Sequence, residues 1–547
     1  MNRAVSRYSL AVAGLFAPAS FAFSQRIAPQ PPPCVIGKGP AIVSLLVPPS
    51  SEVAVLPLVH ESDGEVSMFL SMGIPSAVAE RVAEAIPDLP VLRPRPNRPT
   101  TDDANAMKDM GSQLGARFIV SGTVVEARRS VRLSVSLYDT RSGNRQWTKA
   151  FNYDSASSLG IVRTIATEVA SRIAMPLTPK QSEVLAEVPT KSGGAFEWYV
   201  RGNAAFAGDA FERAADAYRN AIRRDRAFSD AYAKLSLVDA AMMSEGVEKS
   251  TDGTVLKNEL RAAATMSITS DRKSALSWTA EARARMLEGR AASQWREAYD
   301  RALSLSGKDP TILEAYGLAL ASIDERSEAK AILKRAAQAA PWRAEVMTAL
   351  ADLASADGND VEACNLLNTA IATDAFYGPA WADRALLRSR HEELRYAWAD
   401  AETAVKIGSI MLGQSAGAMV DLKSRDTTRA RERLSELWLD VQTRGSLGLG
   451  EGKAVASAFA AAGQIQRAID VLERVRPRVN LFASMLRDPN LERLKREPRF
   501  RSLMAPPTAS GEDGTDTRLG KRMSLRPSPN EVRQFVARPA HGQSVQR

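Results

Sequence analysis

The 547-residue sequence predicts a multidomain chain in which a small α+β domain is followed by an all-α helical solenoid. Apolar and polar residues alternate strictly over residues 131–137, the period of a half-buried β-strand. Small residues recur every 34 positions between Gly317 and Ala404, the spacing of stacked helical repeats. An apolar fraction of 45% and a charged fraction of 25% are typical of globular proteins.

The first 24 residues predict an export signal. Arg3 and Arg7 precede an apolar run over residues 9–23, and Ala22-Phe23-Ser24 has small residues where signal peptidase needs them, with residues 20–22 as a second candidate. Residues 25–51 form a Pro-rich linker. In a bacterium the mature protein is expected to be periplasmic or secreted; an uncleaved membrane anchor is the alternative. No later stretch approaches the ~18 apolar residues of a membrane span.

Residues 52–176 predict the α+β domain. A buried strand comes first, and the last three strands form a meander with a turn over residues 139–143. Pro75 is expected near the start of the first helix, and Asp102 and Asp103 in the first turn of the second. In order, the expected elements are strand 53–58, helix 71–86, strand 89–92, helix 101–114, strands 118–126, 130–138 and 145–153, and helix 157–175.

This block resembles the TolB amino-terminal-like domain. The resemblance rests on VAVLPL, GIPSAVAERVAEAI, LGARFIVSGTVVE, VRLSVSLYDTRSGNRQWTKAFNYD and IATEVASRIA. It implies a mixed α/β module used in protein assembly or sensing, with no catalytic residues. In that family a cyclase or winged-helix domain often precedes the block, and tetratricopeptide repeats follow it. Here the 51 residues before the block are too few for either domain, which argues against a cyclase or transcriptional role.

Residues 195–475 predict the repeat array. Three sets of small residues are spaced by 34, at the positions where the paired helices of tetratricopeptide (TPR) repeats cross: Gly317, Ala351 and Ala385; Ala329, Ala363 and Ala397; Ala336, Ala370 and Ala404. The array therefore resembles TPR repeats, with Pro341 closing one of them. Segments 243–275 and 408–450 fit the pattern poorly and predict irregular helices. Residues 476–505 are expected to form a helical cap, and residues 506–547 a disordered tail.

The TPR resemblance implies a protein or peptide partner held by the first helix of each repeat. The residues expected to face that groove are Phe196, Tyr199, Asn203, Phe206, Glu314, Asp352 and Arg390. The competing interpretation is that these side chains pack between repeats. Whether Cys34 and Cys364 pair is left open, although Cys364 lies on an apolar helical face.

Signals for chemistry are weak. Three scattered His and two Cys predict no metal site, and residues 448–453 lack the full spacing of a phosphate loop. The net charge of +9 comes mainly from the two ends, so no nucleic-acid surface is expected. We therefore expect no enzyme and no cofactor, but an exported scaffold for protein binding. The alternatives are a sensory ligand-binding module lacking its usual fused cyclase or DNA-binding domain, and an envelope assembly or secretion accessory. The oligomeric state stays open.

Overall fold

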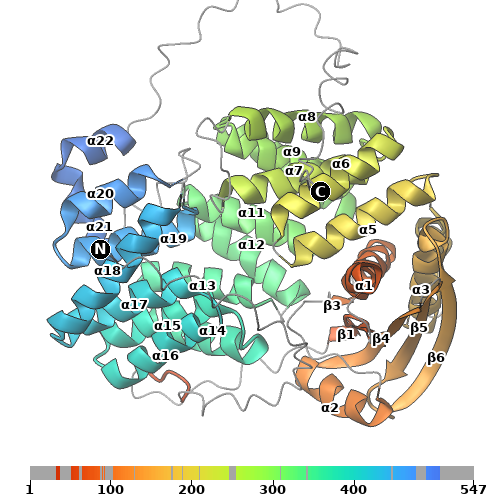
Figure 1. Ribbon diagram of the computed structural model, residues 1–547, viewed down its shortest axis with the longest axis horizontal. Coiled ribbons are helices and arrows are strands. Elements are labelled where there is room, and N and C mark those ends of the chain that lie inside the picture. Colours follow the sequence, from red (N-terminus) through yellow and green to blue (C-terminus); the bar gives the residue numbers. More distant parts are fainter. Residues whose placement is uncertain are drawn as a thin grey trace, which may run out of the picture. The chain divides into compact units, whose positions relative to one another are not determined.

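The computed structural model describes most of the predicted α+β block and repeat array. The described residues are 32–36, 51–60, 64–86, 89, 91–92, 103–127, 130–173, 176–187, 189–208, 210–244, 254–307, 309–340, 343–444, 447–475 and 488–504. The predicted signal peptide, the predicted tail and Pro341 lie outside them. Within them, a mixed β-sheet is followed by a long series of paired helices (Figure 1), so the predicted fold class is confirmed.

The sheet has the strand order β3-β1-β4-β5-β6, and β2 also pairs with β4. β1 runs parallel to β3 and β4, whereas β4, β5 and β6 form the predicted antiparallel meander. Gly143 closes the turn between β5 and β6 at φ +73°, and its N–H donates to the Asp139 carbonyl at 2.8 Å. The strands are β1 Ser51–Val55, β2 Val59–His60, β3 Val91–Leu92, β4 Ala116–Ala127, β5 Ser130–Asp139 and β6 Asn144–Tyr153.

Alternating side chains bury the two faces of this sheet against different helices. Val53 and Leu133 belong to a core that includes helices α1 (Glu65–Ala85) and α3 (Ser158–Ile173). Ala54 and Tyr138 point to the other face, where they meet Met107 of helix α2 (Ala104–Leu114). The period of two in the sequence thus separates two apolar layers.

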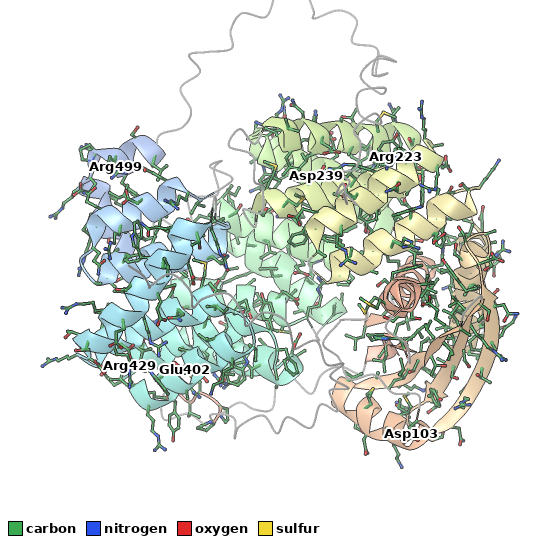
Figure 2. The ribbon with its side chains drawn as sticks, in the orientation of Figure 1. Asp103, Arg223, Asp239, Glu402, Arg429 and Arg499 are labelled. Carbon is green, nitrogen blue, oxygen red and sulfur yellow. A yellow bond between two sulfur atoms is a disulfide. The ribbon has the colours of Figure 1, made fainter. Side chains whose placement is uncertain are left out.

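Two helix starts differ from the prediction. α1 begins six residues earlier than expected, so Pro75 lies in its interior. A proline cannot donate to the carbonyl four residues before it; the Ser71 carbonyl instead accepts the Leu58 N–H at 2.8 Å, which explains why the helix tolerates Pro75. α2 begins at Ala104, so Asp103 precedes its first turn (Figure 2).

A short helix that the sequence did not predict follows α3. Helix α4 (Pro179–Ala186) starts with a capping box in which Thr178 and Gln181 satisfy each other's backbone N–H groups. Its Leu185 is buried in the same core as α1 and α3. α4 therefore extends the covered face of the sheet toward the repeats.

The repeat array consists of antiparallel helix pairs. The small residues at the 34-residue spacing are buried as predicted, and a Cβ on Gly317 would lie 2.6 Å from Leu333 Cγ. The helices are α5 Gly193–Ala207, α6 Phe211–Arg224, α7 Ser229–Ser244, α8 Thr254–Ser270, α9 Ala275–Leu287, α10 Ala292–Ser306, α11 Pro310–Ser322, α12 Arg326–Ala339, α13 Ala344–Ala356, α14 Asp360–Thr373, α15 Gly378–Arg390, α16 Leu394–Lys406, α17 Ile410–Lys423, α18 Thr427–Thr443, α19 Leu449–Ala461 and α20 Ile465–Glu473.

The two segments with a weak repeat pattern are also helical. α8 lies within the first segment, and α9 begins at its last residue. α17 and α18 are regular helices within the second segment. The prediction of irregular helices was therefore wrong there. The helices form because packing of neighbouring pairs stabilises them even where the sequence departs from the repeat consensus.

Short helices cover the end of the array. Leu491, Leu494 and Phe500 are buried against residues of α19 and α20. Arg499 donates to Asp470 and Glu473 of α20 at 2.9 and 2.8 Å (Figure 2). These contacts come from α21 (Pro489–Glu492), the 3₁₀ turn η2 (Arg493–Arg496) and α22 (Pro498–Met504), where the sequence predicts a cap.

Cys34 and Cys364 form a disulfide. It fastens residues 34–36 to α14, and both sulfur-bearing side chains are buried. The Asn368 side chain accepts from the Cys34 N–H and donates to the Cys34 carbonyl, each at 2.9 Å. A segment distant in sequence is thus held on the repeat array by one covalent bond and one amide.

The sheet and the first repeats share a single core. It runs from β1 and β4 through α1 and α3 into α5, α6 and α7. α1 and α5 approach so closely that a Cβ on Gly73 would lie 2.5 Å from the Val200 carbonyl oxygen. The described helices include none that is both long enough and apolar enough to cross a membrane.

Candidate functional site: a groove between α1 and the repeats

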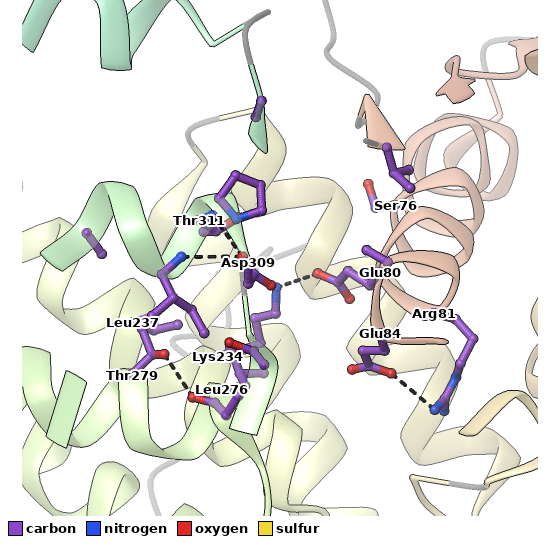
Figure 3. A pocket seen from close by; sticks show the side chains of 18 of the residues that line it. Ser76, Glu80, Arg81, Glu84, Lys234, Leu237, Leu276, Thr279, Asp309 and Thr311 are labelled. Carbon is purple, nitrogen blue, oxygen red and sulfur yellow. Dashed lines mark hydrogen bonds and ion pairs between the residues drawn. The ribbon is translucent and has the colours of Figure 1, made fainter. Parts of the chain in front are cut away.

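A cavity of about 3030 Å³ lies between α1 and the repeats; we call it the groove (Figure 3). α1, β3 and α4 form one wall. The first helices of successive pairs, α5, α7, α9, α11 and α13, contribute to the other, together with the ends of the second helices α8, α10, α12 and α14. The groove reaches Tyr377, at the start of α15. First helices therefore line it, as the repeat pattern predicts.

Helical periodicity explains which side chains reach the groove. On α7 the lining residues are Asp230, Lys234, Leu237 and Ala241, spaced by three or four positions along one face. The opposite faces of α7 are buried, with Tyr232 and Leu235 in the core. On α1 the lining positions Ser76, Glu80 and Glu84 follow the same spacing. Each helix thus gives one face to the core and a second, more polar face to the groove.

Glu80 of α1 connects the two walls. Its carboxylate lies 2.5 Å from the Lys234 ammonium of α7 and also accepts bonds from Tyr199 Oη at 3.2 Å and Asn203 Nδ2 at 3.3 Å. Asn203 in turn accepts the Tyr218 hydroxyl at 2.7 Å. Because Tyr199 and Asn203 belong to the first repeat, α1 occupies the place that a partner helix would take there.

Acidic side chains gather next to this connection. We call Glu80, Glu84, Glu187 and Asp230 the acidic end of the groove. Glu84 pairs with Arg81 at 3.2 Å, and Arg81 also donates to the Val184 carbonyl of α4. Within the described residues the Asp230 carboxylate forms no hydrogen bond or ion pair. The acidic end thus contains four carboxylates, and the cations of Arg81 and Lys234 pair with two of them.

This crowding changes the acidity of two carboxyl groups. The surrounding protein displaces water and raises the pKa of Glu84 to about 7; Arg81 opposes the shift, and Asp230, Glu80 and Glu187 add to it. Burial likewise raises the pKa of Asp230 to about 6, against the effect of Arg81. Although 56% of the Glu84 side chain remains accessible, it faces the groove and not open solvent. The acidic end therefore favours added positive charge.

The far part of the groove is lined by α11, α12 and the loop before α15. Arg343 pairs with Glu314 and donates to the Thr311 hydroxyl at 3.3 Å. Phe376 is 42% exposed in the loop, next to Tyr377. Burial, with nearby acidic groups, holds the Tyr377 pKa well above its usual value, so its hydroxyl stays protonated. This part offers an aromatic surface beside hydrogen-bonding groups.

The residues predicted to bind a partner fall into separate places. Tyr199, Asn203 and Phe206 line the groove, the first two almost completely buried against Glu80. Phe196 is buried and stacks on Tyr199, with ring centres 6.0 Å apart. Glu314 is buried in its pair with Arg343.

The last two predicted residues lie beyond the groove lining. Asp352 is exposed on α13, and nearby protein raises its pKa while Lys453 and Arg390 oppose the shift. Arg390 is half exposed on α15 and donates to the Ser355 hydroxyl at 2.6 Å. The structure does not join these two to Tyr199 and Asn203 in one site.

The sequence pattern did not predict the α1 wall or the charges on α7. Glu80 and Lys234 are 154 residues apart. Glu80 falls within the motif GIPSAVAERVAEAI, which implies no binding role, and Lys234 belongs to no motif. The available signal was the spacing of Ser76, Glu80 and Glu84 along an otherwise apolar helix. That spacing is compatible with an ordinary solvated face, so it did not mark a site.

No metal-binding cluster of His, Cys, Asp or Glu occurs among the described residues. Gly448 precedes α19 and Lys453 lies within it, so residues 448–453 cap and begin a helix that follows another helix and not a strand. The groove can hold a polypeptide through charges, hydrogen bonds and exposed aromatic rings.

Comparison with known proteins shows similarity in helical architecture alone. No family model matches the chain, and no curated protein matches it. Among solved structures, Pseudomonas aeruginosa PilF is 19% identical, covers 39% of this chain and 92% of its own, and has a TM-score of 0.33. Yeast Tom70 is 13% identical over 64% of this chain and 82% of its own, with a TM-score of 0.36. A monomeric IFIT1 mutant with Gppp-AAAA is 12% identical over 59% and 81%, with a TM-score of 0.39. These values carry no inference about ligand.

Proposed function

We propose that this chain is an exported scaffold that holds an extended segment of a partner protein in the groove. The observation that carries the proposal is the groove itself, whose 3030 Å³ is several times the ~300–1,000 Å³ of a small-molecule pocket. Its wall combines charges of both signs with exposed Phe376 and half-buried Phe206. A polypeptide segment presents the same mixture of groups.

The export part of the proposal rests on the first 24 residues and on the disulfide. Structural disulfides persist in oxidising compartments such as the bacterial periplasm and are rare in the cytosol. The pairing of Cys34 with Cys364 is therefore compatible with a cleaved signal peptide. N-terminal sequencing of protein from the periplasmic fraction should begin at Gln25; a full-length N-terminus in the cytosolic fraction would refute export.

We also propose that residues 52–176 are a TolB amino-terminal-like module. Strand β1, helix α1, the β4–β5–β6 meander and the closing helix α3 lie at the positions of the quoted motifs. In this chain the module does more than precede the repeats, because its α1 forms one wall of the groove. The module and the array would then bind the partner together.

A photo-crosslinking experiment tests the binding role. Benzoylphenylalanine is placed at Phe376 or Leu237 in the groove, and at Leu439 of α18 as the control. Leu439 is 61% exposed and does not line the groove. Irradiation of cells should give one defined adduct, identified by mass spectrometry, from both groove positions and none from Leu439. Adducts of equal yield from all three positions, or none from the groove, would contradict the proposal.

A further inference from the structure

The acidic end has a complementary segment in the same chain. Residues 518–547 contain seven Lys or Arg residues and a single acid, Glu531. Apolar side chains are interspersed among the cations, including Leu519, Met523 and Phe535. By contrast, residues 25–51 carry only Arg26 and Lys38 as charges. Of the segments outside the described residues, this one has the largest excess of basic over acidic residues, so it is the best match to the acidic end of the groove.

The groove offers partners for both kinds of side chain. The Asp230 carboxylate has no hydrogen bond or ion pair within the described residues, and Glu84 is paired only with Arg81. Both line the groove beside the apolar side chains of Leu89, Leu237 and Leu276. A cation placed between Glu84 and Asp230 would relieve the repulsion between them, and it would do so where the surrounding protein limits screening by water.

Because the segment and the groove belong to one chain, even a weak interaction between them gives high occupancy. The 43 residues after Met504 span up to about 140 Å when extended, several times the ~23 Å radius of gyration of a compact chain of about 470 residues. A segment joined to its site through the same chain has an effective concentration on the order of millimolar. Even a weak charge-based interaction would therefore be occupied most of the time.

We propose that residues 518–547 dock in the acidic end of the groove and that a partner must displace them to bind. The segment acts as an autoinhibitory occupant: its cations contact Glu84 and Asp230, and its apolar side chains contact the neighbouring leucines. The proposal rests on the groove being a polypeptide site, as proposed above. It adds that the site is covered in the free protein.

Lys521 is the only lysine in this segment, so it provides a specific test. A carbodiimide joins a lysine to a carboxylate only when the two groups touch. In the full chain, Lys521 should be joined to Glu84 or Asp230, as read by mass spectrometry. The matched control is Lys521→Arg, which keeps the charge but removes the reactive amine and should lose the product. Crosslinks from Lys521 mainly to carboxylates outside the groove, or none at all, would overturn the proposal.

A mixture of isotopically light and heavy chains shows whether the contact is intramolecular. Products joining peptides of one isotope only support docking within a chain. Mixed products in the statistical proportion would mean that the segment binds a second copy, and would overturn autoinhibition.

A competition measurement gives the strength of docking. The probe is a fluorescent synthetic peptide of residues 518–547. It should bind the full-length variant Arg518→Ser/Lys521→Ser/Arg522→Ser/Arg526→Ser at least about tenfold more tightly than the wild type, whose own segment competes. Adding Glu84→Gln and Asp230→Asn to that variant should weaken binding by at least about tenfold. Equal affinity for all three proteins would refute the site. Failure here, with groove adducts still formed at Phe376, would reject the docked segment and leave the proposed function standing.

Discussion

At the scale of single residues, Asp400 of α16 is a buried carboxylate that pairs with two arginines. It is fully buried and accepts two hydrogen bonds from Arg384, at 2.9 and 2.8 Å, while Arg388 lies 2.9 Å away. Arg384 also donates to Asn368, the residue that holds Cys34. Asp400 thus pairs with two buried guanidinium groups, of which Arg388 also lies 3.5 Å from Glu393. The network connects α15 and α16 to the disulfide-linked segment.

Replacing Asp400 with Ala leaves the Arg384 guanidinium buried without its anion and removes the nearer of the two carboxylates beside Arg388. We expect the free energy of unfolding to fall by about 3–5 kcal/mol, the usual cost of an uncompensated buried charge. Urea denaturation measures the change. The matched control is Glu492→Ala, which removes an exposed pair with Lys495 and should cost less than about 1 kcal/mol. Similar losses for the two variants would contradict this account of the buried network.

Glu84 makes stability depend on pH. Its folded-state pKa of about 7 lies above the ordinary value of 4.5, so the folded state binds the proton more tightly than the unfolded chain. The contribution of Glu84 to stability is therefore fully present below pH 4.5 and is lost as pH rises through 7. Glu84→Gln should leave the Tm nearly unchanged at pH 5 and raise it at pH 8, where the wild-type carboxylate is charged beside Glu80, Glu187 and Asp230. Arg81 opposes this repulsion but does not reverse it.

Thermal melts of both proteins across pH 5–8 measure this difference. Glu212→Gln, on the exposed face of α6 outside the groove, serves as the control and should show no trend with pH. A Glu84→Gln melting difference that is constant with pH would mean that the groove does not perturb this carboxyl group.

At the scale of elements, patterns of residues close in the sequence were sufficient to locate most helices and strands. The alternation over residues 131–137 located β5, and the 34-residue spacing located α11 to α16, because both signals come from residues close in sequence. α1 was placed six residues late since Pro75 normally marks a helix start. Its tolerance in the helix interior depends on the Leu58 N–H, a contact that no local pattern records.

Of the two walls of the groove, only the one formed by the repeats could be predicted from the sequence. The repeats indicated that first helices line a concave face, and Tyr199, Asn203 and Phe206 do line the groove. What the sequence could not show is that α1 covers the first repeat, since this depends on packing between elements more than 100 residues apart. The partners of Tyr199 and Asn203 therefore come from within the chain.

Close packing of α1 on α5 gives a prediction for this pair of helices. Gly73→Ala would place a methyl group 2.5 Å from the Val200 backbone oxygen, so the two helices must separate. We expect a loss of about 1–3 kcal/mol in unfolding free energy, typical of overpacking. Gly160→Ala in α3 is the matched control, because no atom lies within 4 Å of its new Cβ; it should be neutral or stabilising by up to about 1 kcal/mol. Denaturation curves compare them, and a neutral Gly73→Ala would show that α1 is not held against α5.

For the molecule as a whole, two long-range features connect parts that are distant in the sequence. One is the apolar core shared by β1, α1, α5 and α7. The other is the disulfide, which closes a covalent loop of 330 residues from Cys34 to Cys364. That loop contains the whole α1 wall and almost all residues that line the groove. The bond therefore restricts the unfolded chain over the same region whose folded form builds the site.

Cys364→Ser should accordingly lower the free energy of unfolding by about 2–5 kcal/mol under oxidising conditions, since a crosslink over a long loop removes much unfolded-state entropy. Urea denaturation with and without dithiothreitol separates this cause from a change in packing. Reductant should bring the wild type down to the level of the variant and leave the variant unchanged. If mass spectrometry confirms reduction and the wild type keeps its stability, the bond would not be structural, and the support it gives to an exported protein would be lost.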